Sequence, residues 1–324
     1  MRSPSLLFTA LGLLLVVALG LAIACGSTAM SLSQLAIGLL APQSLDGSIV
    51  WQLRLPRALA ALVCGGLLAV AGCLMQILLR NPLADPSILG VSGGAATAAL
   101  LAISFGLSGT AVSQLAFLGA LGAMSLVLLL ADVRQHWDNT RLLLTGVVVA
   151  AGWGACISFI LTMSPDKRVH SMLFWLMGDL SDAPVPWLAG AGLLLALVLA
   201  TAMGRHLNVL MRGELQARAL GVPVTGLRLS LYLLACLTTA LAVTLGGTLG
   251  FVGLVVPHLL RLLGVVDHRL LVPACALLGG ALVMLADTLA RSLLAPVQLP
   301  VGVVTAFLGV PVFLWILRRS GGHP

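Results

Sequence analysis

Apolar stretches of roughly 20 residues recur along this chain, each bounded by charged residues, proline or polar clusters. In hydrocarbon every backbone amide needs an internal partner, so only helical bundles and closed barrels can span a membrane. These stretches have the length that a helix needs at about 1.5 Å per residue. They lack the alternation over about ten residues that is typical of barrel strands. The pattern predicts an all-α, polytopic membrane protein.

Composition supports this fold class. Hydrophobic residues make up 60% of the 324 residues and charged residues only 8%, whereas soluble domains carry about 25% charged residues. A water-soluble globule is therefore excluded. We expect residues 1–324 to form a single transmembrane domain, and no soluble domain or internal repeat is recognisable. An inverted repeat of two halves would not be visible at this level.

Hydrophobic windows predict about ten transmembrane helices. Glycine at 246–247 predicts a break or a short helix there. The first span follows Arg2 and resembles a secretory signal, but its apolar run is too long for one, so we expect it to be retained. The expected spans are 5–25, 58–79, 88–106, 112–131, 142–162, 186–204, 229–247, 249–266, 270–290 and 300–317.

The placement of basic residues predicts the orientation. With the N-terminus in the cytoplasm, twelve of the 17 Lys and Arg residues fall in inner segments. The five on the outside are Arg54, Arg57, Lys167, Arg168 and Arg291. Cytoplasmic segments carry such an excess of positive charge, so both termini are expected inside.

Several kinds of chemistry lack their sequence signals. The six cysteines form no C-x-x-C pair, which argues against a metal cluster or disulfides, and no basic block or aromatic motif supports a nucleic-acid partner. The only lysine, Lys167, follows Pro165-Asp166, so there is no phosphate-binding Gly-x-x-x-x-Gly-Lys motif. We expect no enzyme activity, cofactor or metal, and any ATP hydrolysis must come from another polypeptide. The absence of a membrane-embedded carboxylate cluster disfavours an ion-coupled transporter.

The longest predicted cytoplasmic segment, about 205–228, contains a candidate lever for a cytosolic partner. Glu214 and Arg218 are spaced to pair on one short helix. Gly221 can adopt the left-handed conformation that ends a helix, and Pro223 prevents its continuation. The alternative is a plain connector between two spans.

Several strings over about residues 50–318 resemble the FecCD-type permease family, the membrane subunits of type II ABC importers for ferric siderophores, haem and cobalamin. These strings occur in the family's order. They are Arg54-Leu55-Pro56-Arg57, residues 76–94 with Asn81-Pro82-Leu83-Ala84-Asp85-Pro86, the loop 214–221, Gly250-Phe251-Val252-Gly253-Leu254-Val255-Val256-Pro257-His258 with Arg261, Asp267-His268-Arg269, and Leu299-Pro300-Val301-Gly302.

The resemblance implies a complex in the bacterial inner membrane. It would contain a second permease copy, two cytosolic ATP-binding subunits and a periplasmic substrate-binding protein. The loop after the sixth span would be the coupling helix that docks on the ATPase. The residues concerned are Gly213, Glu214, Ala217, Arg218, Leu220 and Gly221.

The resemblance also implies that Arg54, Arg57 and Arg291 meet glutamates of the binding protein, as exposed cations at the outer surface. Interfacial snorkelling is the alternative for Arg54 and Arg57. For Arg291 the alternative is a pair with Asp287, four residues earlier on the same helix.

The cytoplasmic gate of the family corresponds most closely to Asn81, Leu83, Asn139 and Thr140, where the last two positions admit a one-residue slip. Turn formation by Asn and Pro is the alternative. We interpret His258 as forming a structural hydrogen bond near a broken helix rather than as a haem ligand or proton relay.

The leading hypothesis is therefore an ABC importer permease for a bulky metal chelate. The stretch 261–277 is closer to cobalamin permeases than to most haem ones, with a ferric siderophore nearly as well supported and haem as the alternative. An ion-coupled secondary transporter and a non-transporting scaffold or sensor are the rivals from other classes.

Overall fold

The computed structural model describes residues 3–26, 30–131, 138–181, 183 and 185–320, and these parts contain helices and no strands. The apolar helices are α1 Pro4–Ala24, α4 Leu55–Leu79, α5 Val91–Ser104, α6 Thr110–Ala131, α7 Asn139–Met163, α9 Trp187–Ala202, α12 Val224–Gly246, α13 Val252–Leu262, α14 His268–Ser292 and α15 Val301–Ser320. The shorter elements are α2 Leu32–Leu40, α3 Leu45–Ser48, the π-helix η1 Ile49–Arg54, the 3-10 helix η2 Pro86–Leu89, α8 Asp166–Met177, α10 Gly204–Leu210 and α11 Glu214–Ala219.

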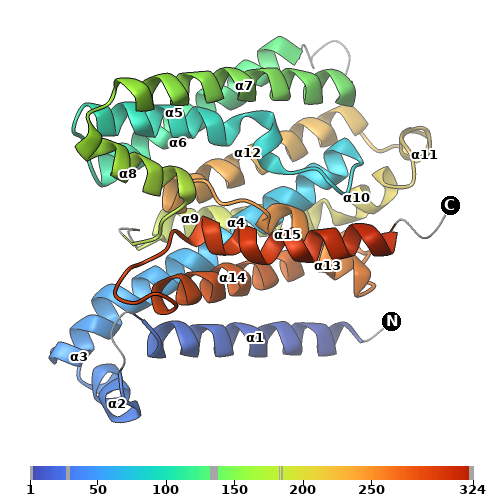
Figure 1. The fold of residues 1–324 in the computed structure, drawn as a ribbon. Coiled ribbons are helices and arrows are strands. Elements are labelled where there is room, and N and C mark those ends of the chain that lie inside the picture. The colour runs from blue at the N-terminus through green and yellow to red at the C-terminus, as the bar shows by residue number, and fades with distance from the viewer. Residues whose placement is uncertain (1–2, 27–29, 132–137, 182, 184, 321–324) are drawn as a thin grey trace.

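The expected membrane-spanning architecture is confirmed. Six of the described helices are long and apolar enough to cross a membrane, the bent pair α9 and α10 adds a seventh, and three shorter apolar helices bring the set to ten. The long helices run side by side, with α10 and α11 at one end of the bundle and α3 and α8 at the other (Figure 1). We refer to these as the α11 end and the α8 end. The start of α1 and the end of α15 lie at the α11 end (Figure 1).

The core of the bundle forms around α4, which is buried along most of its length and packs against α12, α13 and α14. Small residues allow these backbones to meet, as expected in a membrane. A Cβ added to Gly65 of α4 would lie 2.2 Å from the carbonyl oxygen of Gly279 on α14. The pair α4 and α14 is therefore held at backbone contact.

The structure refines the expected boundaries. The span expected at 88–106 is shortened because η2 and a left-handed Gly90, with φ 75°, precede α5. The predicted break at 246–247 is confirmed, since α12 ends at Gly246 and α13 begins only at Val252 and is 11 residues long. Helix α8 has no counterpart among the expected spans, because its polar face gives it low overall hydrophobicity.

Candidate functional site

Helix α11 forms as the sequence predicted. It begins at Glu214 after Gly213, whose φ of 138° is open to glycine alone. At its other end Gly221 has φ 77° and donates its N–H to Arg218, while Val222 donates to Ala217. These two bonds are those of a Schellman motif, which satisfies the last carbonyls of a helix. The short helix is thus defined at both ends by local chemistry.

Glu214 is the centre of the ion pairs on α11. One carboxylate oxygen accepts from Arg218 at 2.9 Å and the other from Arg228, the fifth residue of α12, at 2.8 Å. The Arg228 side chain is 6% exposed, against 56% for Arg218. Hydrogen bonding from Arg218 and the charge of Arg228 hold the pKa of Glu214 below its ordinary value. The carboxylate therefore stays charged at neutral pH, and the pairs would be lost only as the pH falls through that lowered pKa.

Of the remaining predicted residues of the loop, one is buried against the bundle and one is exposed. Ala217 is buried, whereas Leu220 is 71% exposed at the end of the helix. Arg80, the residue that follows α4, donates to the carbonyl oxygen of Leu210, just before the loop, at 3.2 Å. The loop is therefore fixed on the bundle by one side and presents an apolar side chain to its surroundings on the other.

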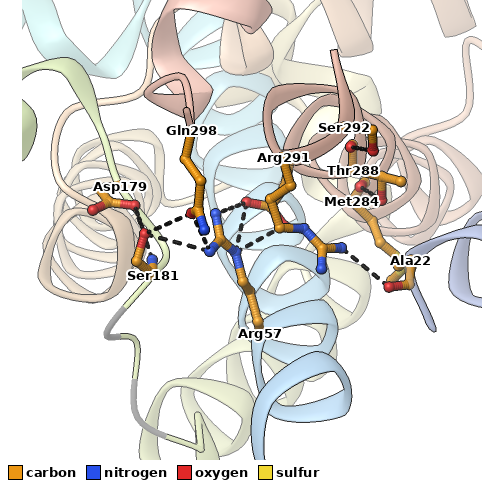
Figure 2. Close-up of polar contacts among 10 residues, drawn as sticks. Ala22, Arg57, Asp179, Ser181, Met284, Thr288, Arg291, Ser292 and Gln298 are labelled. Atoms are coloured by element: carbon orange, nitrogen blue, oxygen red, sulfur yellow. Dashed lines mark hydrogen bonds and ion pairs between the residues drawn. The ribbon is translucent and has the colours of Figure 1, made fainter. Parts of the chain in front are cut away.

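At the α8 end a polar cluster joins α4 to α14 (Figure 2). Arg57 binds both oxygens of Asp287, with Nη2 at 2.8 Å from Oδ1 and Nε at 3.1 Å from Oδ2. Its Nη1 donates to Gln298 at 3.0 Å and to Ser181 at 3.3 Å. Arg291 lies on the other side, with Nε 3.1 Å from Asp287 Oδ2. One carboxylate thus serves two guanidinium groups.

The end of α1 is held by the same cluster. The carbonyls at the end of a helix lack intrahelical donors and carry partial negative charge. Arg54 donates to the carbonyls of Ile23 and Ala24, both at 2.7 Å, and Arg291 donates to that of Ala22 at 3.1 Å. The two arginines thus close the terminus of α1.

These contacts test the predicted exposure of the three arginines. The sequence led us to expect exposed cations, but Arg54, Arg57 and Arg291 are 4%, 9% and 5% exposed. That expectation of exposure is wrong, because Asp287 and the end of α1 surround the guanidinium groups. The alternative for Arg291, a pair with Asp287 on its own helix, is confirmed. A role in docking stays a prediction.

The predicted gate segments meet at the α11 end. Asn139, the first residue of α7, donates to the carbonyl oxygen of Leu78 near the end of α4, at 3.1 Å. Asn81 lies three residues after Leu78, and its side chain accepts from the backbone N–H of Leu83 at 2.9 Å. Leu83 and Thr140 are both exposed. The turn-forming alternative is confirmed for Asn81, and gating stays a prediction.

The motif around Pro257 receives a structural explanation. Proline has no N–H, so Pro257 leaves the carbonyl of Gly253 in α13 without its helical donor. Gln76 of α4 approaches that carbonyl at 3.4 Å and also accepts from Arg261. By contrast, the buried Nδ1 of His258 has no hydrogen-bond partner in the described part of the chain. Our hydrogen-bond interpretation is therefore wrong for that atom. Gln76, rather than His258, contacts the carbonyl that Pro257 leaves without its helical donor.

Sequence reasoning missed several residues of these clusters. Ser181 and Gln298 lie in loops, 124 and 241 positions from Arg57, and only the fold brings them to it. Asn208 of α10 was also missed, although it lies within the segment 205–228. Its position on a short amphipathic helix before the predicted lever was the one available signal.

Comparisons with known proteins agree with this geometry. The model of the FecCD transport family matches residues 14–319. The chain is 42% identical over 277 residues to the vitamin B12 import system permease protein BtuC of Shigella sonnei, and 41% identical to that of Escherichia coli O127:H6, with 84% of each chain covered in both cases.

Comparison with solved structures agrees with the family match. A metal-chelate type ABC transporter in an inward-facing conformation superposes with a TM-score of 0.85 at 31% identity, covering 98% of this chain and 100% of the other. PsaBC from Streptococcus pneumoniae, solved in complex with Fab, shares the fold with a TM-score of 0.58 at 19% identity, over 84% of this chain and 93% of the other. The chain therefore belongs to the FecCD transport family and is a multi-pass permease of the ABC importer class.

Proposed function

We propose that this chain forms the translocation path of an importer in a bacterial inner membrane, with both termini in the cytoplasm, as one domain over residues 1–324. The observation that carries the proposal is α11, a helix of six residues that is capped at both ends and anchored to the buried Arg228. It presents the exposed Leu220 and lies at one end of the bundle (Figure 1). A separate ATPase would bind here, since the sequence lacks a phosphate-binding motif.

The proposed assembly contains two copies of the chain, two ATP-binding subunits and a periplasmic binding protein. The relatives named as import permeases support the partners. Glycines at 152 and 154 on α7 have open space around them, and small residues of this kind permit close helix packing in a membrane. This face suits a second copy. Asn81, Leu83, Asn139 and Thr140 then form the gate at the α11 end.

For the cargo we propose a metal chelate, with cobalamin first. The support is the 42% identity to a vitamin B12 import permease, together with the structural likeness to a metal-chelate transporter. A ferric siderophore is the second candidate and haem the third. Within the described residues no cluster of His, Cys, Asp or Glu could hold a metal ion. In this proposal the metal is part of the cargo.

Docking of the binding protein is proposed at the α8 end. Arg57 and Arg291 share the carboxylate of Asp287, and Arg54 and Arg291 donate to the carbonyls at the end of α1. We expect carboxylates of the partner to be attracted to these guanidinium groups over long range. Because the guanidinium groups are buried, direct contact requires the end of α1 or the loop of Ser181 to move aside.

The coupling proposal is tested by copurification with the candidate ATPase. Changing Glu214 to Ala removes the partner of the buried Arg228, and changing Gly221 to Val opposes φ 77°. We expect each variant to weaken ATPase binding at least about tenfold, equivalent to about 1.4 kcal/mol. Lys167→Ala in α8, at the opposite end, is the control and should bind as the wild type does. Unchanged binding by both loop variants would contradict the coupling role.

A further inference from the structure

Helix α10 lies directly against the beginning of α14. It follows α9 after a bend of 57°, and its Leu207 and Leu210 are buried. A Cβ added to Gly204, its first residue, would lie 2.5 Å from the Cγ of Arg269 and 3.1 Å from its backbone nitrogen. The helix that leads into α11 is therefore in close contact with the first turn of α14.

Asn208 joins the two helices by hydrogen bonds in both directions. Its Nδ2 donates to Oδ1 of Asp267 at 2.8 Å, and its Oδ1 accepts from the backbone N–H of His268 at 3.0 Å. The same Oδ1 lies 2.6 Å from Nδ1 of His268. Asp267 is the N-cap of α14, where its carboxylate also accepts from the N–H of Arg269 at 3.0 Å. One amide therefore contacts both the cap and the first N–H of α14.

The residue type matters at this position. An amide can donate to the carboxylate of Asp267 while it accepts from His268. A carboxylate at 208 would keep the acceptor but place two like charges about 2.8 Å apart, and an apolar side chain would remove all the bonds. These distinctions allow a direct test.

Helix α14 extends from this contact to the opposite end of the molecule. It is continuous over 25 residues, which is about 37 Å at 1.5 Å per residue. Near its other end it carries Asp287 and Arg291, which bind Arg57 and the end of α1. The loop of α10 and α11 is thus linked through one helix to the polar cluster at the α8 end.

We propose that Asn208 is a positioning residue that transmits displacement of α11 to α14, and through it to the α8 end. This inference rests on the proposed coupling role of α11. A shared rigid element whose position both ends influence is the physical basis for coupling between distant sites. The contacts of Asn208 with Asp267 and His268 provide that link at the end of α14 that faces the proposed ATPase site.

The test uses the complete complex with its ATPase and two reporter positions. A fluorescent label is attached at Met211→Cys beside α11, or at Leu294→Cys two residues beyond α14, after Cys25 and Cys156, which are exposed, are changed to Ser. The signal is read before and after adding ATP with vanadate. In the wild-type background we expect both positions to respond. With Asn208→Asp or Asn208→Leu, the response at 211 should persist and that at 294 should fall about fivefold or more.

Asp267→Asn provides the matched comparison. Alone it should reduce the response at 294 slightly, but combined with Asn208→Asp it should restore much of that response because it removes the repulsion between two carboxylates. His206→Ala, at an exposed position of α10, should leave both responses intact. If Asn208 had only a structural role, its variants would lower the thermal unfolding midpoint, and Asp267→Asn would not restore the response at position 294.

The outcomes separate the two proposals. If neither position responds in the wild-type background, the proposed coupling role of α11 fails. If position 211 responds but 294 does not, or if the Asn208 variants respond at 294 like the wild type, the relay through Asn208 is overturned and the coupling role stands.

Discussion

Replacing Asp287 with alanine is expected to destabilise the folded chain by about 3–5 kcal/mol, because it leaves two guanidinium groups buried without their shared carboxylate. Asp287 is 1% exposed and pairs with Arg57 and Arg291, which are 9% and 5% exposed. Gln298 and Ser181 still contact Arg57 but carry no charge to offset it. The loss should appear as a large fall in the thermal unfolding midpoint of the purified chain in detergent.

Two further variants check the cause. Asp166→Asn removes an exposed carboxylate in the first turn of α8 and should change the midpoint little. Replacing Arg57, Asp287 and Arg291 together by Met, Leu and Met should be much less harmful than Asp287→Ala alone, since a buried ion pair is often replaceable by apolar residues of similar volume. Wild-type stability of Asp287→Ala would show that the cluster is not held by its carboxylate.

Changing Gly72 to alanine is the second variant with a large expected effect. The added Cβ would lie 1.9 Å from the carbonyl oxygen of Gly253 and 2.4 Å from its Cα, so the backbones of α4 and α13 must separate. Overpacking of this kind costs about 1–3 kcal/mol and occasionally more. The separation would also stretch the contact of Gln76 with the carbonyl that Pro257 leaves unpaired. We expect a lower midpoint and a lower yield of folded chain.

Gly226 supplies the control, because it is exposed on α12 and a Cβ there has nothing within 4 Å. Gly226→Ala should be neutral or stabilise the helix by up to about 1 kcal/mol. If Gly72→Ala unfolded at the same temperature as Gly226→Ala, the close approach of α4 and α13 would not exist in the protein.

The sequence was sufficient for the features that depend on local chemistry. The spans follow from apolar length, and the ends of α11 follow from Gly213, Gly221 and Pro223, whose backbone preferences act within a few residues. The pairing of Glu214 with Arg218 also follows from spacing along one helix. All of these features are confirmed in the structure.

Features that depend on tertiary packing could not be predicted from the sequence. Arg57 was expected to be exposed because it lies beside proline at the end of an apolar run, but its partner Asp287 is 230 positions away. The second partner of Glu214, Arg228, lies 14 positions away and had been placed in the cytoplasmic segment rather than in α12. Neither spacing is one that helix periodicity can reveal.

The central claim is that this chain transports a chelate only when a separate ATPase acts on it through α11. The most direct measurement is uptake of labelled cobalamin, with ferric siderophores and haem in parallel, into vesicles that hold the chain with its ATPase, binding protein and ATP. We predict uptake of one chelate by the complete system, none when the ATPase or ATP is omitted, and a loss of about tenfold or more with Glu214→Ala. Uptake by the chain alone under an ion gradient, or full uptake by the Glu214 variant, would contradict the account.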